Sequence, residues 1–531
     1  MSLDQTPINQ LITDNIDTWT STVKTKSASG RGSSKKRELY GVKKLRELIL
    51  ELAVRGKLVP QDPTDEPASV LLERIAVEKA QLVKDKKIKK QKALPEISEQ
   101  DVPFLAPVGW EWTRLDDLVE VLDSRRKPIS KKDRVSGPYP YYGASGIVDF
   151  VDDYIFDENL ILIGEDGAKW GKGDNTAFPV TGKSWVNNHV HVVRGIHSGL
   201  VDQFLVYSLV AQDLNEYITG ITVPKLNQAR LRTILVAVPC EAEQKRIVAK
   251  VDELMILCDQ LVQQTEASIE AHQVLVTTLL DTLTNSANAE ELMQNWQMVA
   301  EHFDTLFTTE ESIDQLKQTI LQLAVMGKLV NIGEKKETLL KSVLTFGPRN
   351  GFSPKESSTE TQLKVLKLGA TSYGVLDLKQ SKFIDVDISD KPYLYINQGD
   401  ILIQRGNSAN FVGSNVLIQE SYSDYIYPDL MMKLRVNDEV LPEYVSLLLS
   451  SKFSREHMWS QMTGTSGTMP KISKKVVEGV PIMFPVCLAV QKTILEKYNE
   501  LIGVCELLMA RLNFLEYTKV NLTDAIVEQA V

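Results

Sequence analysis

Several features that would place this 531-residue chain in a familiar class are missing. No apolar run approaches the roughly 20 residues that a helix needs to cross a bilayer. The N-terminus, MSLDQTPINQ, lacks the basic start and apolar stretch of a secretory signal. Cys240, Cys258, Cys487 and Cys505 form no C-x-x-C pair, which argues against a zinc or redox motif. We therefore expect a reduced, cytoplasmic protein that does not act at a membrane.

Motifs of catalysis are scarce as well. Thr181-Gly182-Lys183-Ser184 resembles the end of a phosphate-binding loop, but Ala177 stands where that motif needs its first glycine. The chain has no Gly-rich methyl-donor loop after a strand. It also lacks the tetrapeptide (Asn or Asp, two prolines and an aromatic residue) that grips a flipped base in amino-methyltransferases. These absences favour a recognition protein over an enzyme.

The histidines give no metal site. Of the six, only His189 and His191 are closely spaced, and strand alternation would place both on one face. A metal would need further ligands, which the sequence does not supply nearby. We expect a structural or base-contacting role for this pair, and neither a metal nor a cofactor on the chain itself.

Two pairs of sequence blocks reveal an internal repeat. Residues 45–59 and 316–330 are identical at ten of fifteen positions, and residues 242–261 and 489–508 at nine of twenty. The first block opens each half of the chain and the second closes it, while the segments between them differ. This order predicts two variable domains on one duplicated frame.

The repeated blocks have helical spacing. Ile247, Val251, Leu254, Cys258 and Leu261 follow the 4-3-4-3 pattern of a helix–helix seam, as do their counterparts around Cys505. We expect long paired helices, antiparallel and similar to a coiled coil, with both cysteines buried. Residues 67–93 also have helical spacing, and we expect a shorter helical counterpart from Glu337.

The segments between the blocks contain short apolar runs that predict strands, at 159–164, 190–193, 234–239, 400–404, 431–434 and 480–485. The fold class predicted is mixed α/β (α+β), with a pseudo-two-fold internal repeat. The predicted parts are a flexible arm at 1–37, a helical region at 38–103, a first variable domain at 104–240, a helical spacer at 241–344, a second variable domain at 345–487 and a C-terminal helix at 488–531.

Charge is unevenly distributed along the chain. The net charge is −10, yet residues 241–312 alone hold 14 acidic and 3 basic residues. Lys24–Arg46 contains nine bases and one acid, and Lys79–Lys92 contains seven bases and one acid. The acidic average therefore does not exclude nucleic acid, and the acidic helical region suits a protein partner.

Motifs in a fixed order carry a family resemblance. They are Leu52–Val59 (LAVRGKLV), Gly109–Trp112 (GWEW), Pro138–Ile147 (PYPYYGASGI), Gly164–Gly167 (GEDG), Asn187–His189 (NNH), Pro224–Leu226 (PKL) and Gly399–Gly406 (GDILIQRG). Together with the duplication, they resemble the DNA-specificity subunit of bacterial Type I restriction–modification systems, from about residue 38 onward. Val490 departs from the family's usual acidic residue before Gln491.

The resemblance implies a function without catalysis. Two target-recognition domains, 104–240 and 345–487, would each read one half of a split, asymmetric sequence in double-stranded DNA. The paired helices would act as a ruler and dock two methyltransferase subunits, which carry the S-adenosylmethionine chemistry. A separate restriction and translocase subunit, driven by ATP and Mg²⁺, would complete a complex that defends against phage.

DNA contacts need Lys and Arg for phosphates, and Arg, Lys, Asn or Gln for base edges. The candidates in the first domain are Arg125, Arg126, Lys127, Lys169, Lys172, Asn187, Asn188, His189 and Lys225. Those in the second are Arg405, Asn407, Asn410, Lys471, Lys474 and Lys475. Lys225 and Lys471 occupy matching positions in the repeat, so we expect their replacement by alanine to weaken DNA binding.

Two other functions stay open at this point. A single-chain restriction or methyltransferase enzyme would need the missing donor loop and tetrapeptide. A scaffold with two domains that bind ligands other than DNA would have the same repeat, but would fail to bind a duplex together with its partners.

Overall fold

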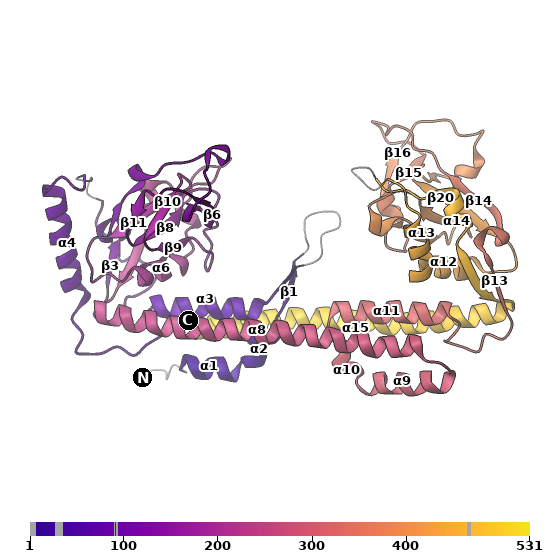
Figure 1. Cartoon of the computed structure of the whole chain (residues 1–531), viewed down its shortest axis with the longest axis horizontal. Helices are drawn as coiled ribbons and strands as arrows, with labels where there is room; N and C mark the ends of the chain where they lie inside the picture. The colour runs from indigo at the N-terminus through magenta and orange to yellow at the C-terminus, as the bar shows by residue number, and fades with distance from the viewer. Residues whose placement is uncertain (1–6, 27–35, 90, 92–93, 465–468) are drawn as a thin grey trace. The chain divides into compact units, whose positions relative to one another are not determined.

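A computed structural model describes residues 7–26, 36–89, 91, 94–464 and 469–531. The chain forms two compact units. Unit 1 is built from Arg37–Glu266, Glu516–Val531 and the N-terminal residues up to Lys24, and unit 2 chiefly from Ala267–Leu515. Each unit combines a mixed α/β sheet domain with long helices (Figure 1), as the sequence predicts. No helix among the described residues is long and apolar enough to cross a membrane.

The sheet domain of unit 1 is centred on a four-stranded antiparallel sheet of order β4-β11-β8-β9. These strands are β4 (Val119–Val121), β8 (Leu160–Gly164), β9 (Ala177–Val180) and β11 (Val190–Gly195). Every residue of β8 is buried, because Ile161 and Ile163 pack into one core while Leu160 and Leu162 pack into another. A strand covered on both faces reads as a continuous apolar run, which is why LILIG is recognisable in the sequence.

Other elements complete this domain. A second sheet has the order β6-β5-β10-β7, and β3 pairs with β12. Their bounds are β3 (Glu111–Arg114), β5 (Tyr139–Gly143), β6 (Gly146–Val151), β7 (Phe156–Asp157), β10 (Lys183–Val186) and β12 (Leu235–Val238). The helices are α4 (Ala68–Lys84), α5 (Leu115–Leu118), α6 (Asp202–Val210) and α7 (Gln228–Leu231), with short 3-10 turns at η1 (Asp123–Arg125), η2 (Lys131–Asp133) and η3 (Asn215–Tyr217).

Unit 2 repeats the same plan with a different sequence. Its four-stranded sheet has the order β14-β20-β17-β18, β13 pairs with β21, and β16-β15-β19 form a further sheet. The bounds are β13 (Lys335–Leu339), β14 (Leu344–Asn350), β15 (Lys364–Leu366), β16 (Ser381–Phe383), β17 (Ile401–Gln404), β18 (Asn415–Leu417), β19 (Tyr425–Ile426), β20 (Met431–Val436) and β21 (Pro481–Pro485). As in β8, the residues of β17 alternate between two cores. The strand order therefore shows the duplication that the repeated blocks predict.

The remaining elements of this domain are helices α12 (Pro442–Ser450), α13 (Lys452–Ser460) and α14 (Lys474–Glu478). The 3-10 turns are η4 (Leu340–Val343), η5 (Leu368–Thr371), η6 (Pro392–Leu394) and η7 (Ala409–Phe411).

Two long helices, α8 (Glu241–Asn285) and α15 (Leu488–Ala530), are each continuous. In unit 1 the start of α8 shares a core with α3 (Tyr40–Val54) and with the last turns of α15. In unit 2 the end of α8 shares a core with α11 (Glu310–Val325) and with the first half of α15. The pairing is therefore antiparallel. Cys258 and Cys505 are fully buried in these seams, as predicted.

The N-terminal arm differs from the prediction. Residues 1–37 were expected to be flexible, but α1 (Ile8–Asp14) and α2 (Ile16–Ser21) are helices, and Trp19 is fully buried against α3. Gly41 allows this contact, because a Cβ there would lie 2.3 Å from the carbonyl oxygen of Trp19. Short strands β1 (Lys24–Lys26) and β2 (Lys36–Glu38) follow. Residues 1–6 and 27–35 of the predicted arm lie outside the described residues.

The second sheet domain begins earlier in the chain than predicted. Strand β13 pairs with β21 from Lys335 to Leu339, so the sheet domain begins inside the segment 241–344 that was predicted as a helical spacer. The helical counterpart expected from Glu337 is wrong for the same reason. Every residue of this strand is at least partly exposed, so KKETL lacks the apolar alternation by which a strand is recognised. Helices α9 (Ala289–Glu301) and α10 (Phe303–Leu306) complete unit 2.

Candidate nucleic-acid interface

Each sheet domain contains the same backbone corner, where the end of strand β8 or β17 meets a loop that carries a lysine. In unit 1, Leu226 N–H donates to the Glu165 carbonyl (2.8 Å), and Lys225 exchanges two backbone hydrogen bonds with Thr219 (2.8 and 2.9 Å). We call this corner 1: Glu165, Asp166, Thr219, Lys225 and Leu226. The corner lies beside the start of α7, which Asn227 caps by accepting from Arg230 N–H.

Corner 2 has the same hydrogen bonds in unit 2. Ile472 N–H donates to the Arg405 carbonyl (2.9 Å), and Lys471 exchanges two bonds with Thr463 (both 2.9 Å). Corner 2 is Arg405, Gly406, Thr463, Lys471 and Ile472. Ser473 caps α14, as Asn227 caps α7. Residues 225 and 471 are thus equivalent in backbone as well as in sequence, and Glu165 is equivalent to Arg405.

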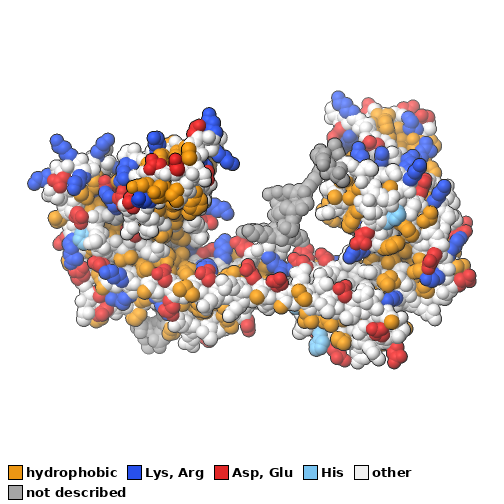
Figure 2. Space-filling model, viewed as in Figure 1, with side chains coloured by type: hydrophobic (Ala, Val, Ile, Leu, Met, Phe, Trp, Pro, Cys, Tyr) orange, Lys and Arg blue, Asp and Glu red, His pale blue; other side chains and the backbone are white. Residues whose placement is uncertain are grey.

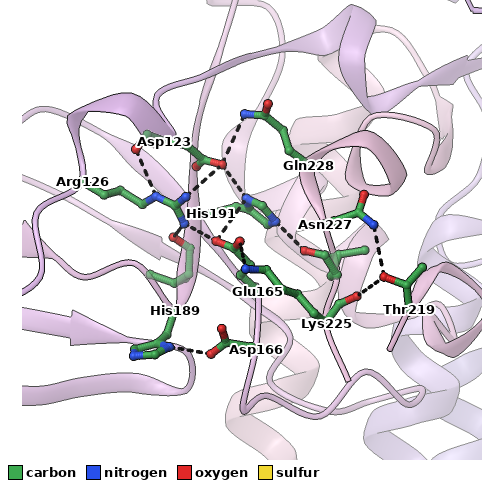
Figure 3. Close-up of polar contacts among 12 residues, drawn as sticks. Asp123, Arg126, Glu165, Asp166, His189, His191, Thr219, Lys225, Asn227 and Gln228 are labelled. Atoms are coloured by element: carbon green, nitrogen blue, oxygen red, sulfur yellow. Dashed lines mark hydrogen bonds and ion pairs between the residues drawn. The ribbon is translucent and has the colours of Figure 1, made fainter. Parts of the chain in front are cut away.

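The side chains of corner 1 belong to a charged cluster (Figure 3). The buried carboxylate of Glu165 accepts from Lys225 Nζ (2.8 Å) and from the guanidinium of Arg126. Arg126 also donates to the Val190 carbonyl (2.7 Å), which leaves its side chain only 14% exposed. Glu165 therefore binds two of the cations that were predicted to contact DNA.

His191 lies behind this pair, buried in β11. Its Nε2 faces the Leu226 carbonyl oxygen (2.7 Å), and its Nδ1 faces Asp123 Oδ2 (2.6 Å). A carbonyl oxygen only accepts, so Nε2 donates to Leu226 and Nδ1 faces the Asp123 carboxylate. Asp123 also accepts from Val192 N–H (2.9 Å). The cluster thus joins η1, β8, β11 and the lysine loop.

The carboxyl pKa values follow from these contacts. Burial alone would raise the pKa of Asp123, but the hydrogen bond and charge of His191, the Val192 N–H and Arg126 hold it below its usual value. Burial likewise opposes ionisation of Glu165, and Lys225 and Arg126 lower its pKa. The hydrogen bond to Glu165 raises the pKa of Lys225. Both acids are therefore ionised at neutral pH and neutralise the cations around them.

Asp123, Glu165 and His191 have the residue types of a metal site, and their ligand atoms lie within 4.8 Å of one another. Their donor atoms are already engaged, however. Both ring nitrogens of His191 face protein acceptors, and Glu165 holds two cations that would repel a metal. The arrangement fits a structural charge cluster, and the absence of a bound metal stays a prediction.

The predicted pairing of His189 with His191 on one strand face is wrong. β11 begins at Val190, so His189 lies in the preceding turn with an exposed side chain, whereas His191 is buried. His189 Nδ1 contacts Asp166 Oδ1 (2.5 Å), and the backbone N–H of His189 donates to Oδ1 of the buried Asn187 (2.8 Å). Asn188 is exposed beside them.

The other candidates of the first domain fall into two groups. Arg125 pairs with Glu158 (2.7 Å) and lies over the Phe156 ring, and Lys172 pairs with Glu51 of α3. Burial lowers the pKa of Lys172. Lys127 and Lys169 are exposed, with Lys127 near the Trp185 ring. The structure thus brings Arg126, His189 and Lys225 together, and places Arg125 and Lys172 in separate ion pairs.

Corner 2 differs in its charge. Within the described ranges, no carboxylate lies at ion-pair distance from Arg405 or Lys471, although other ion pairs of this domain are resolved. Arg405 is half-buried and Lys471 exposed, and the stem of Lys471 lies over Gly406. Asn407 donates to Gln404 (2.6 Å), while Asn410, Lys474 and Lys475 are exposed. Figure 2 shows Lys and Arg side chains among acidic and apolar ones on the visible face of each sheet domain.

The sequence reasoning missed Asp123, Glu165 and His191 as members of one cluster. Glu165 belongs to the GEDG motif and His191 to the H-x-H pair, so the sequence carries a weak signal for both. Asp123 had none, because its contact with His191 joins distant parts of the chain.

Two matching corners with different side chains, on one duplicated helical frame, define a protein with two related but distinct sheet domains. Comparison with known proteins gives the family. A model described as the Type I restriction modification DNA specificity domain matches residues 107–271. The chain is 34% identical to the Type I restriction enzyme EcoEI specificity subunit of Escherichia coli, across 99% of this chain and 100% of that protein.

The Type I restriction enzyme EcoAI specificity subunit of Escherichia coli is 35% identical, with the same coverage. The chain therefore belongs to the specificity subunits of Type I restriction enzymes. One solved chain, described under complex assembly and conformational transition of the type I R-M system, is similar in fold. Its TM-score is 0.50 at 16% identity, and the match covers 81% of this chain and 99% of that one.

Proposed function

We propose that this chain reads a bipartite, asymmetric target in double-stranded DNA, with one sheet domain for each half. The observation that carries the proposal is the pair of equivalent corners whose side chains differ. The same backbone carries Glu165 and Asp166 in unit 1, but Arg405 and Gly406 in unit 2. Because base readout depends on side chains, two such domains would recognise different half-sites.

The residues proposed to contact DNA are the fifteen candidates named above, in two roles. Exposed cations that form no ion pair with another described residue, such as Lys169, Lys474 and Lys475, suit phosphate contacts. Asparagines and the corner residues suit base edges. Arg125 and Lys172 would have to exchange a carboxylate for DNA, which makes them the weaker contacts of this set.

We also propose that the helices dock two methyltransferase subunits. Residues 241–312 concentrate the negative charge, which disfavours DNA as their neighbour. In unit 2, Val274 and Leu275 of α8 and Val504 and Leu507 of α15 are exposed apolar side chains. Apolar side chains left on a helix surface fit a protein interface better than solvent.

On this proposal the chain supplies the address and its partners supply the chemistry. S-adenosylmethionine would bind the methyltransferase subunits, and ATP with Mg²⁺ would bind a separate restriction and translocase subunit. The chain itself would be non-catalytic and would act in the cytoplasm, where foreign DNA arrives.

Methylation mapping tests the proposal. The chain is produced with its methyltransferase partners in a host free of other Type I systems, and the methylated positions of the genome are sequenced. We expect one split motif with two unlike halves, absent when this chain is omitted. Methylation without this chain, or at an unsplit motif, would contradict the proposal.

A further inference from the structure

The two corners share one backbone arrangement, so the charges of their side chains can be compared position by position. Glu165 follows β8 as Arg405 follows β17, and the backbone N–H of each donates to the residue just before the neighbouring strand, at 3.0 Å to the His189 carbonyl and 2.8 Å to the Leu430 carbonyl. Each then accepts from the residue after the loop lysine. Glu165 and Arg405 therefore occupy one structural position with opposite charges.

Corner 1 is neutralised internally. Lys225 Nζ lies 2.8 Å from Glu165 Oε1, Arg126 pairs with the same carboxylate, and His189 contacts Asp166. A phosphate that approaches this corner would compete with carboxylates already in place. The gain in free energy from releasing DNA counterions would be small here.

Corner 2 has no carboxylate at the positions equivalent to Glu165 and Asp166. Gly406 stands where corner 1 has Asp166, and Leu430 and Met432 stand where it has His189 and His191. Asp429 is the nearest acid in sequence to Leu430, and it accepts from the Ser353 hydroxyl (2.5 Å) instead. Within the described part of unit 2, Arg405 and Lys471 are thus two cations without an acidic partner.

We infer that the residue directly after β8 or β17 sets the charge that each domain offers to DNA: Arg405 contacts DNA, whereas Glu165 neutralises Lys225 and keeps it from DNA. The inference rests on the proposed function, and it adds that the sheet domain of unit 2 offers more positive charge to DNA than the sheet domain of unit 1. A guanidinium with five donors can bind a phosphate or the O6 and N7 atoms of guanine. Arg405 is available to either acceptor, because no carboxylate within the described residues pairs with it.

The test uses the chain assembled with its methyltransferase partners and a duplex that carries the mapped target. Binding is measured between about 50 and 200 mM salt, where each phosphate contact contributes about 0.9 to the slope of log affinity against log salt. Wild-type binding to this duplex tests the proposed function by itself. The substitutions of Arg405, Glu165, Lys225 and Lys471 test the charge assignment alone, so its failure can be told apart from a failure of the proposed function.

Arg405→Gln should weaken binding and lower the salt slope by about one if the contact is a phosphate. If the contact is guanine, it should instead change the base preference of one half-site with little change in slope. Arg405→Lys should retain a phosphate contact but lose a bidentate guanine contact. Arg405→Glu should rebuild the Glu165 arrangement around Lys471 and lower the slope by about two.

Glu165→Gln should act in the opposite direction. It frees Lys225 and Arg126, so affinity for non-target DNA and the salt slope should both rise. Lys471→Ala should weaken binding more than Lys225→Ala, because only Lys471 is unpaired. Lys452→Gln, an exposed cation of α13 near Glu456 (3.8 Å), is the charge-matched control.

Thermal unfolding of each assembled variant verifies that the fold is intact. The inference is overturned if the folded Arg405 variants match Lys452→Gln in affinity, slope and half-site preference, or if Glu165→Gln lowers the salt slope.

Discussion

Gln244 and Gln491 make the same pair of hydrogen bonds, each at the base of its own sheet domain. Gln244 Oε1 accepts from Val201 N–H (2.8 Å), and its Nε2 donates to the Pro239 carbonyl (3.0 Å). Gln491 accepts from Leu441 N–H (2.9 Å) and donates to the Pro485 carbonyl (2.8 Å). Both side chains are fully buried. One amide in each unit thus joins the start of a long helix to the last strand and to a helix of the sheet domain.

Replacing either glutamine by leucine should destabilise the protein by about 1–3 kcal/mol, because a backbone N–H and a carbonyl lose their buried partner. Urea unfolding followed by circular dichroism measures the loss. Gln297→Leu, on the exposed face of α9, is the control and should change stability by less than about 0.5 kcal/mol. Equal effects of the three substitutions would contradict this account of the junction.

Cysteine reactivity should separate one thiol from the other three. Cys487 is exposed, whereas Cys240, Cys258 and Cys505 are buried. Burial raises the pKa of Cys258 to about 11, and it raises the pKa of Cys240 and Cys505 as well. Thiolates are the reactive form, so one thiol per native chain should react rapidly with a thiol reagent at neutral pH. Cys487→Ser should remove that rapid phase, and a persisting rapid phase would show that a seam is open.

Asp123→Asn should make the protein less stable at neutral pH, by about 1–3 kcal/mol, because the buried His191 loses its charged partner. The pKa of Asp123 is lowered in the folded state, so the stability it contributes is present above the ordinary value of 3.8 and is lost as pH falls through the lower folded pKa. The difference from wild type should therefore shrink below about pH 4.

Urea unfolding at several pH values measures this difference, with the exposed Asp152→Asn as the control. A difference that stays constant down to pH 2 would indicate that the charge of Asp123 is not what stabilises the cluster.

Trp19→Ala should cost about 3–5 kcal/mol, because the indole is fully buried between α2 and α3. Ile16→Ala changes a partly exposed residue of the same helix and should cost much less. Unfolding of the full chain measures both. If Trp19→Ala leaves stability unchanged, residues 8–21 form the flexible arm that the sequence had indicated.

Local patterns made much of the fold predictable. LILIG of β8 is apolar because both of its faces are covered, and Ile247, Val251 and Leu254 keep the spacing of a buried seam. By contrast, β13 is a charged strand without alternation, and only its pairing with β21 reveals it. The packing of α1 and α2 depends on a close approach of Gly41 to Trp19, which local pattern does not encode.

The candidate site was predictable only in part. Lys225 and Lys471 were found because the repeat aligns them, and the backbone shows them to be equivalent. Their different surroundings were hidden, since Glu165 reaches Lys225 through the loop geometry and His191 reaches Asp123 across the sheet. Charge pairing between distant residues follows from tertiary structure. The sequence alone therefore predicted Arg126, which is paired, and Arg405, which has no acidic partner among the described residues, as equal candidates for DNA contact.

The most direct test of the central claim exchanges one recognition domain. Residues 104–240 are replaced by the corresponding segment of a specificity subunit with a different target, and the host genome is mapped for methylation. We predict that one half of the split motif changes while the other half is retained. A change in both halves, with the chimaera folded and active, would contradict the assignment of one sheet domain to each half-site.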